Sequence, residues 1–253
     1  MRASLLMYNP PALQDANKRF WGLISTRLRD AGIDAPETLS EDGFGTDFWT
    51  AKDMVFSQTC GMPYRTKLHG KVQIVGTPDY GVEGCAPGYY CSVLLKRQDD
   101  TRTQLSEFDG ARVATNGFDS QSGFAALVNE IADSDIRFGR CVVTGAHAAS
   151  VAAVANGKAD IAATDAVTWH FLSRDGGVAE GVEVLARTRP TPGLPFICAS
   201  TMSRETIFDA VSQAIEALSQ SDRDLLMLRG LVHIPVSAYL SVPTPRGGES
   251  ELV

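Results

Sequence analysis

The stretch Arg112–Phe124, with the sequence RVATNGFDSQSGF, constrains the fold more than any other part of the chain. It predicts a strand over Arg112–Thr115, a glycine-containing turn, and a helix over Ser120–Ala132 with an apolar stripe. The first turn of a helix has backbone N–H groups without intrahelical partners, and the helix dipole places partial positive charge there. Such a junction is suited to hold an anion. Ser120 and Ser122 either add hydroxyl donors to that site or only cap the helix.

The same alternation of strand and helix runs through most of the chain. We expect strands at residues 4–8, 53–57, 71–76, 89–96, 112–115, 140–144, 160–163, 182–186 and 196–200. We expect helices at residues 14–31, 120–132, 146–156, 165–172 and 203–219. Strands that alternate with helices are typical of an α/β fold with parallel sheets and crossover helices.

Two extended passages, near residues 77–96 and 187–200, interrupt this alternation. If the chain passes twice between two lobes, one lobe is built from both ends of the sequence and the other from its middle. We therefore expect lobe I at residues 1–88 and 197–253 and lobe II at residues 89–196, with the crossings as a hinge. Each lobe is predicted to be a mainly parallel sheet flanked by helices, with a ligand cleft between the lobes.

Composition excludes several classes of protein. The net charge of -7 and the lack of a basic run argue against a nucleic-acid surface. No segment approaches the roughly 18 apolar residues of a membrane span, so we expect no membrane insertion. The N-terminal sequence has no recognisable signal peptide, which predicts a cytoplasmic protein.

The cysteines indicate neither a disulfide framework nor a zinc site, because there are five of them and no CxxC pair. Cys85 and Cys91 are close enough in sequence to be bridged, but buried or free thiols are the favoured interpretation. We expect no metal and no cofactor.

Two further junctions carry polar residues where a strand meets a helix. His147 lies at the start of the second predicted helix of lobe II, where an imidazole can donate to an anion or serve only in packing. Asp165 follows a buried strand, and it either caps its own helix or accepts a hydrogen bond from the ligand. Small polar residues occupy the three junctions at residues 57–61, 115–122 and 144–147, which suggests a shared pocket.

An enzyme on the same fold is the alternative to a binding protein. Cys60 at a helix start is a candidate reactive thiol with His147 as its base. No spacing in the sequence supports this pair, and the common hydrolase, zinc-protease and P-loop motifs are missing from the sequence.

Five segments resemble the phosphate, phosphite and phosphonate-binding proteins of ABC uptake systems, which have the type 2 periplasmic-binding-protein fold. They are FSQTCGMPY (56–64), GCAPGYYCSVLL (84–95), VATNGFDSQSGF (113–124), TGAHAASVAAVANGKADIAATDA (144–166) and TPGLPF (191–196). The resemblance implies that a small anionic ligand is captured as the two lobes close, for uptake through an ABC permease in the periplasm.

Site residues follow from the resemblance position by position. Ser120, Gln121 and Ser122 correspond to the helix start that holds the oxyanion, and His147 corresponds to a second anion donor. Asp165 falls where relatives place an acidic residue that meets an amine or hydroxyl group of the ligand. The resemblance also implies that two residues complete the site from lobe I, namely Tyr8 and Thr59. A cytoplasmic ligand-sensing domain of the same fold is the remaining alternative.

Overall fold

A computed structural model describes residues 1–174 and 176–253 of the chain, together with the backbone of Asp175. Contacts within the chain divide it into two compact units. Unit 1 comprises Met1–Tyr89 and Pro192–Ser241, and unit 2 comprises Tyr90–Thr191 and Val242–Val253. Each unit contains one five-stranded sheet.

The sheet of unit 1 has the strand order β1-β2-β11-β3-β12. These strands are β1 (Arg2–Ala3), β2 (Met54–Gln58), β11 (Phe196–Ala199), β3 (Val72–Asp79) and β12 (Gly230–Val232). β1 is parallel to β2, while β11 runs antiparallel to both β2 and β3, and β12 runs antiparallel to β3. All five residues of β2 are buried, so this strand lies in the core of the unit.

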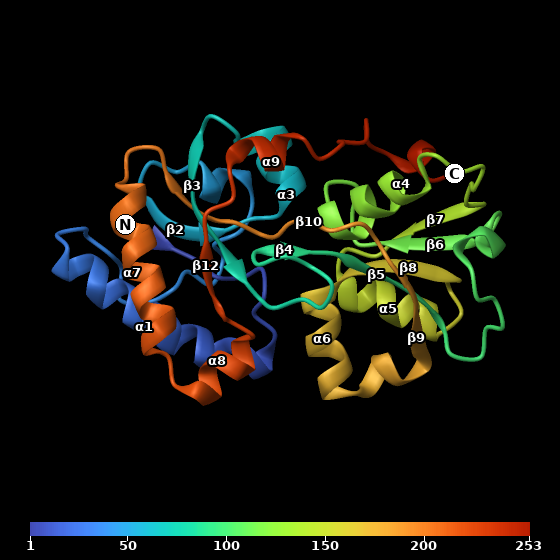
Figure 1. Cartoon of the computed structure of the whole chain (residues 1–253), viewed down its shortest axis with the longest axis horizontal. Coiled ribbons are helices and arrows are strands. Elements are labelled where there is room, and N and C mark those ends of the chain that lie inside the picture. Colours follow the sequence, from blue (N-terminus) through green and yellow to red (C-terminus); the bar gives the residue numbers. More distant parts are fainter. The chain divides into compact units, whose positions relative to one another are not determined.

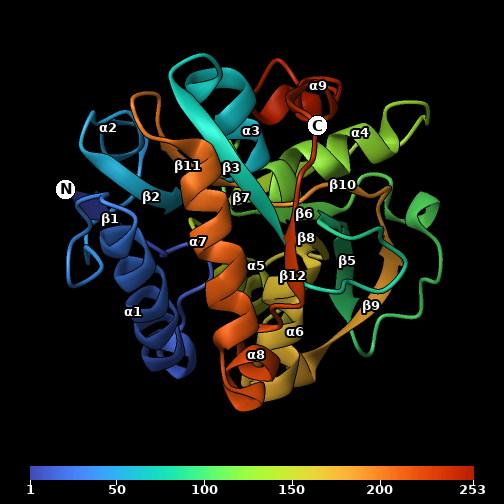
Figure 2. The same ribbon diagram turned by 60° about the vertical axis from the view of Figure 1, so that its left-hand side comes forward.

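Helices pack on the sheet of unit 1 along amphipathic faces. They are α1 (Gln14–Asp30), α2 (Thr46–Trp49), α3 (Gly61–Pro63) with a π-helical extension (Tyr64–Leu68), α7 (Arg204–Ala217), α8 (Gln220–Leu226) and α9 (Val236–Leu240). A 3₁₀ turn (Pro11–Leu13) precedes α1. α1 and α7 lie side by side (Figures 1 and 2). Ser203 caps α7, because its hydroxyl accepts from the backbone N–H of Thr206.

The sheet of unit 2 has the strand order β7-β6-β8-β5-β9. These strands are β7 (Arg140–Val143), β6 (Arg112–Thr115), β8 (Ile161–Asp165), β5 (Ser92–Arg97) and β9 (Val182–Arg187). β6 is parallel to β7 and β8, whereas β5 is antiparallel to β8 and β9. The carboxyl ends of β6, β7 and β8 therefore meet at one edge of this sheet.

The helices of unit 2 start at that edge. A π-helical turn, η4 (Gln121–Ala125), continues directly into α4 (Ala126–Ile131), and α5 (His147–Ala155) and α6 (Ala166–Asp175) follow β7 and β8. Three 3₁₀ turns complete the unit, at Leu105–Phe108, Gly177–Gly181 and Glu249–Glu251. α5 packs against β5, β6 and β8 with Val151 and Val154 fully buried (Figure 2).

The two crossings pair with each other as a separate two-stranded ribbon. It is formed by β4 (Tyr89–Tyr90) and β10 (Thr191–Pro192), at the two positions where the chain passes between the units. Beside it, the backbone N–H of Gly193 donates to the carbonyl of Gly88 at 2.8 Å. A Cβ at Gly193 would lie 2.8 Å from that carbonyl oxygen, so this position requires glycine.

The α/β class with two units agrees with the sequence-based expectation, but the sheets are mixed rather than mainly parallel. The difference arises from the path of the chain. β5 and β11 each follow a crossing without an intervening helix, so each enters its sheet antiparallel to its neighbours. A crossover helix is what brings a chain back for a parallel strand.

The prediction of a strand over residues 4–8 is wrong. β1 ends at Ala3, and Tyr8 lies in a turn. The Nδ2 group of Asn17 donates to the backbone carbonyl of Tyr8 at 2.9 Å, which holds this turn against α1. Pro10 and Pro11 follow immediately and provide no N–H groups for a sheet.

The C-terminal residues also depart from the predicted lobe I, since Val242–Val253 belongs to unit 2. Leu252 is fully buried, and its carbonyl accepts from the backbone N–H of Phe138 at 2.8 Å. The carboxylate of Glu249 accepts from the N–H of Cys141 on the edge strand β7 at 3.1 Å. This packing could not be predicted from the sequence, because the segment is polar and rich in glycine and only one leucine, Leu252, packs into the unit.

Leu252→Ala is expected to lower the free energy of unfolding by about 2–4 kcal/mol, because it leaves a cavity in the core of unit 2. Val253→Ala is the matched control, since that neighbouring side chain is 41% exposed and should change stability by less than about 0.5 kcal/mol. Urea unfolding followed by circular dichroism measures both. Equal effects of the two substitutions would contradict the packing of this segment on unit 2.

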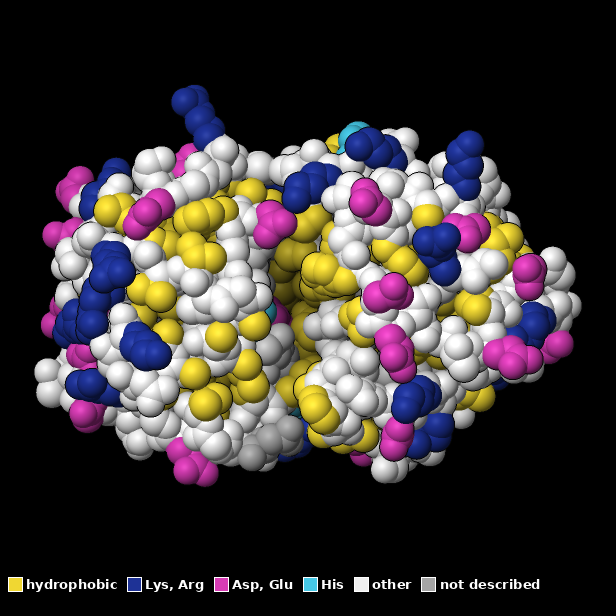
Figure 3. All heavy atoms as spheres, turned by 180° about the vertical axis from the view of Figure 1, so that it is seen from behind, with side chains coloured by type: hydrophobic (Ala, Val, Ile, Leu, Met, Phe, Trp, Pro, Cys, Tyr) yellow, Lys and Arg dark blue, Asp and Glu magenta, His cyan; other side chains and the backbone are white. Residues whose placement is uncertain are grey.

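Charged side chains of both signs are interspersed on the face seen in Figure 3. Among the described residues, no helix combines the length and the apolar character that crossing a bilayer requires.

Candidate functional site

The first helix start of unit 2 has the cap that its sequence predicts. The hydroxyl of Ser120 accepts from the backbone N–H of Gly123 at 3.0 Å. Ser120, Gln121 and Ser122 are all buried, so these polar residues do not form an ordinary exposed cap. Ser92 on β5 donates its hydroxyl to the carbonyl of Ser122 at 2.8 Å, which fixes the backbone of the turn to the sheet.

The second helix start lies directly against the first. His147 is the first residue of α5, and its Nε2 lies 3.0 Å from the hydroxyl oxygen of Ser122. The carboxylate of Asp165 lies 3.4 Å from the same nitrogen. Ser122, His147 and Asp165 therefore form one cluster, although they come from three different junctions.

Asp165 caps its own helix and also faces His147. One carboxylate oxygen accepts from the backbone N–H of Thr168 at 2.8 Å and so caps α6. The other oxygen is the one that faces His147. Capping does not exclude a contact with a ligand, because a carboxylate has several acceptor positions.

Burial controls the protonation of His147. Transfer of the imidazole out of water lowers its pKa from the ordinary value of 6.5, while the Asp165 carboxylate and the Ala163 backbone oppose this effect. The imidazole of the unliganded protein is therefore neutral at pH 7.

Stability is expected to depend on pH through His147. Below pH 6.5 the unfolded chain binds a proton that the folded protein takes up only at lower pH, so the free energy of unfolding decreases as the pH falls. His147→Asn removes this contribution, and the stability advantage of the wild type over the variant should shrink between about pH 8 and pH 5.5. Urea titrations at several pH values measure the difference, and a constant difference would refute the assignment.

Two residues near the cluster were not predicted as site residues. Asn116 follows β6, and a Cβ built at Gly123 would lie 1.8 Å from Asn116 Oδ1 and 3.2 Å from His147 Cε1. The sequence Asn-Gly at 116–117 is a common turn signal, which explained Asn116 without a functional role. Gly123 is needed because Asn116 and His147 pack closely against it.

In unit 1, Tyr80 links the surroundings of Tyr8 and Thr59. The ring of Tyr8 meets the ring of Tyr80 edge to face, with the centroids 5.2 Å apart. Gln58, which directly precedes Thr59, donates from Nε2 to the Tyr80 hydroxyl at 3.0 Å. Thr59 is fully buried and its hydroxyl has no hydrogen-bond partner.

No disulfide joins any of the five cysteines, all of which the structure describes, so Cys85 and Cys91 are not bridged. Cys60 is 8% exposed, and it precedes a three-residue helix. Within the described part of the chain, no three His, Cys, Asp or Glu side chains lie close enough to hold a metal ion.

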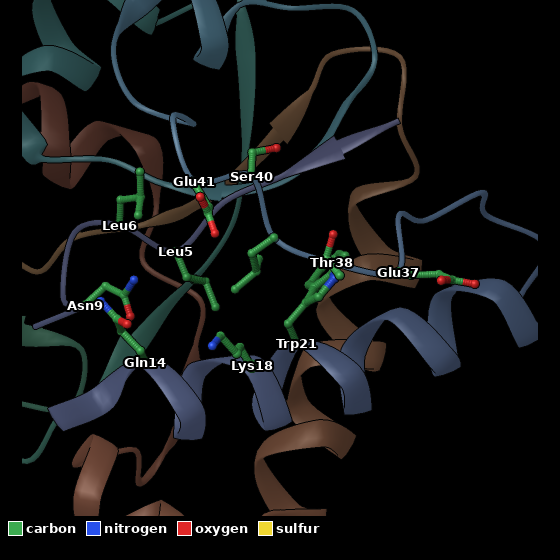
Figure 4. Close-up of a pocket in the computed structure, with 11 residues that line it drawn as sticks. Leu5, Leu6, Asn9, Gln14, Lys18, Trp21, Glu37, Thr38, Ser40 and Glu41 are labelled. Carbon is green, nitrogen blue, oxygen red and sulfur yellow. The ribbon is translucent and has the colours of Figure 1, made fainter. Parts of the chain in front are cut away.

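A separate cavity of about 750 Å³ lies within unit 1, between α1, the residues that follow β1, and the loop at 37–41 (Figure 4). Leu5 and Trp21 are its buried apolar residues, and its charged residues are Lys18, Glu37 and Glu41. None of the described residues that line it is a predicted site residue. It is therefore distinct from the cluster at His147.

Comparison with solved structures shows the fold. The chain is similar to a Xanthomonas citri protein, XAC2383, solved with chloride (TM-score 0.71, 14% identity, 94% of this chain and 92% of that chain covered). It is also similar to PhnD1 of Prochlorococcus marinus (MIT 9301) in complex with methylphosphonate (TM-score 0.70, 13% identity, 94% of each chain covered). A third structure is a binding protein component of a phosphonate ABC transporter of Pseudomonas aeruginosa (TM-score 0.63, 14% identity, 92% and 80% covered).

These similarities confirm the type 2 periplasmic-binding-protein fold. No curated protein sequence matches the chain. The sequence model of one family does match, described as the periplasmic substrate-binding protein of a phosphonate ABC transporter. Membership of that family implies a small ligand and an ABC permease as partners. Because the match spans residues 53–237, well over half of the chain, the protein belongs to the periplasmic substrate-binding proteins of phosphonate ABC transporters.

Proposed function

We propose that this protein captures a small oxyanion of the phosphonate, phosphate or phosphite type and delivers it to an ABC permease without a catalytic step. The observation that carries the proposal is the meeting of two helix starts at one point, where Ser122 Oγ lies 3.0 Å from His147 Nε2. Two helix dipoles, a hydroxyl and an imidazole then act on the same small volume. The family match supports the same class of ligand.

Local donors are what such a site needs, because the overall field opposes anion binding. The chain carries a net charge of -7, so an oxyanion is attracted only at short range. Buried donors are effective there, because hydrogen bonds to a charged group strengthen where water is excluded.

Asp165 restricts which oxyanion fits. A carboxylate 3.4 Å from His147 repels a fully ionised ligand but accepts a hydrogen bond from an amine, a hydroxyl group or a protonated phosphonate oxygen. We therefore expect a preference for ligands that carry such a donor.

Ser122→Ala and His147→Asn are each expected to weaken binding of methylphosphonate or inorganic phosphate by about 1–3 kcal/mol, the range for a lost hydrogen bond to a charged group. Isothermal titration calorimetry measures the affinities. Ser173→Ala is the control, because this serine of α6 is exposed and donates only to the carbonyl of His170. Variants that bind a probe as tightly as the wild type does would remove these two residues from the site.

We extend the proposal to Tyr8 and Thr59 of unit 1. Their support is the unpaired buried hydroxyl of Thr59 and the Tyr80 contacts that hold both residues in place. Tyr8→Phe and Thr59→Val keep the shape of each side chain and remove one hydroxyl. If these variants leave affinity unchanged, unit 1 does not contribute these groups.

The enzyme alternative has less support. Ser122 and Asp165 both face Nε2 of His147, whereas in a nucleophilic triad the carboxylate holds the opposite ring nitrogen. Cys60 is nearly buried, which disfavours reaction with a substrate. Rapid alkylation of Cys60 by iodoacetamide in the folded protein would restore this alternative.

A further inference from the structure

Two buried polar atoms beside the proposed oxyanion site have no hydrogen-bond partner. They are Oδ1 of Asn116 and Nδ1 of His147. A buried polar atom without a partner is destabilising, and native structures contain few of them. A hydrogen bond between these two atoms would satisfy both at once.

The two side chains meet at Gly123. A Cβ at this glycine would lie 1.8 Å from Asn116 Oδ1 and 3.2 Å from His147 Cε1, so these two atoms are at most about 5 Å apart. Nδ1 is bonded directly to Cε1. Because Gly123 has no side chain, Asn116 Oδ1 occupies the space beside the imidazole ring.

The other ring nitrogen of His147 already faces the proposed ligand site. Nε2 lies 3.0 Å from the Ser122 hydroxyl oxygen and 3.4 Å from an Asp165 carboxylate oxygen. An imidazole that donates from Nε2 on this side and from Nδ1 towards Asn116 carries a proton on both nitrogens. It is then an imidazolium.

We infer that Asn116 is a positioning residue for His147, whose Oδ1 accepts the Nδ1–H of the imidazolium that forms when an oxyanion binds. This inference rests on the proposed function, because the bound anion stabilises the second proton. The proton comes from solvent, and no covalent bond forms or breaks.

The charge balance around the imidazole favours protonation only when the anion is present. Asp165 is the charged side chain that faces the ring, and Ser122 and the Ala163 backbone are neutral. Burial outweighs this single carboxylate and keeps the free imidazole neutral. A bound anion adds further negative charge at short range, which raises the pKa of His147.

Nuclear magnetic resonance of protein labelled with ¹³C at histidine Cε1 tests the inference directly. The chain has four histidines, so the spectrum has four signals, and the one missing from His147→Asn belongs to His147. In the wild type, saturation with methylphosphonate is expected to move this signal at pH 7.5 from the neutral to the protonated position.

Asn116→Leu keeps the size of the side chain and removes the acceptor. We expect it to retain part of the affinity but to lose at least half of the ligand-induced rise in the pKa of His147. A rise equal to that of the wild type would overturn the inference, because the imidazolium would then form without the Asn116 acceptor.

Asn116→Asp provides a test that needs no ligand. A carboxylate within about 5 Å is expected to raise the pKa of His147 in the free protein by about 1 or more. Asn156→Asp adds the same charge at the other end of α5 and is the control, with little change expected. An unchanged pKa in Asn116→Asp would overturn the inference.

The two proposals fail in different ways. If neither methylphosphonate nor inorganic phosphate gives a calorimetric signal or moves any histidine resonance, the proposed function fails, while Asn116→Asp still tests the contact with His147. If the wild type binds a probe while His147 stays neutral, the role of Asn116 is wrong and the proposed function stands.

Discussion

Gly123→Ala is expected to weaken binding of methylphosphonate or phosphate at least tenfold, a loss of about 1.4 kcal/mol or more. The added methyl group would lie 1.8 Å from Asn116 Oδ1 and 3.2 Å from His147 Cε1, so both side chains must move. Both side chains border the point where the two helix starts meet. Overpacking of this kind also lowers the free energy of unfolding by about 1–3 kcal/mol. Calorimetry and urea unfolding measure the two effects.

Gly22→Ala is the matched control for this prediction. Gly22 lies within α1, and a Cβ there would meet no atom within 4 Å. Alanine in a helix is favoured over glycine by about 0.5–1 kcal/mol, so stability should rise while affinity stays the same.

A double substitution tests whether the loss of stability comes from the clash with Asn116. Asn116→Ala removes the atom that the new methyl group would strike, so the Gly123→Ala/Asn116→Ala protein should recover most of the lost stability. Strict additivity of the two substitutions would contradict the geometry around Gly123.

Phe56→Ala is expected to lower the free energy of unfolding by about 3–5 kcal/mol. Phe56 is fully buried on β2, with its ring centroid 4.7 Å from that of Phe196 and 5.9 Å from that of Trp21. The three rings join the sheet of unit 1 to α1. Loss of the Phe56 ring leaves a large cavity that surrounding side chains cannot fill. Urea unfolding monitored by circular dichroism and by tryptophan fluorescence measures the change.

Phe44→Ala separates the effect of burial from the loss of an aromatic ring. Phe44 is 60% exposed, although its ring lies against Trp49, so its truncation should cost less than about 1 kcal/mol. A loss below about 2 kcal/mol for Phe56→Ala would mean that the core of unit 1 collapses around the cavity.

Local features of unit 2 could be predicted from the sequence, because they depend on neighbours in the chain. β6 has the predicted bounds Arg112–Thr115, and the caps at Ser120 and Asp165 form as their residue types predict. Each cap is a contact between residues three positions apart, so pattern and propensity suffice. The ligand-binding roles of Tyr8, Thr59, Gln121 and the other site residues stay predictions until binding is measured.

Only the tertiary structure decided the features that depend on distant parts of the chain. β5 and β11 enter their sheets antiparallel because of where each crossing ends, and Leu252 packs in unit 2 through a contact with Phe138. The sequence by itself determined where polar residues meet helix starts. The structure decided that Ser122, His147 and Asp165 share one point and that Asn116 borders it, because parallel strands bring their carboxyl ends together while a linear pattern contains no such distances.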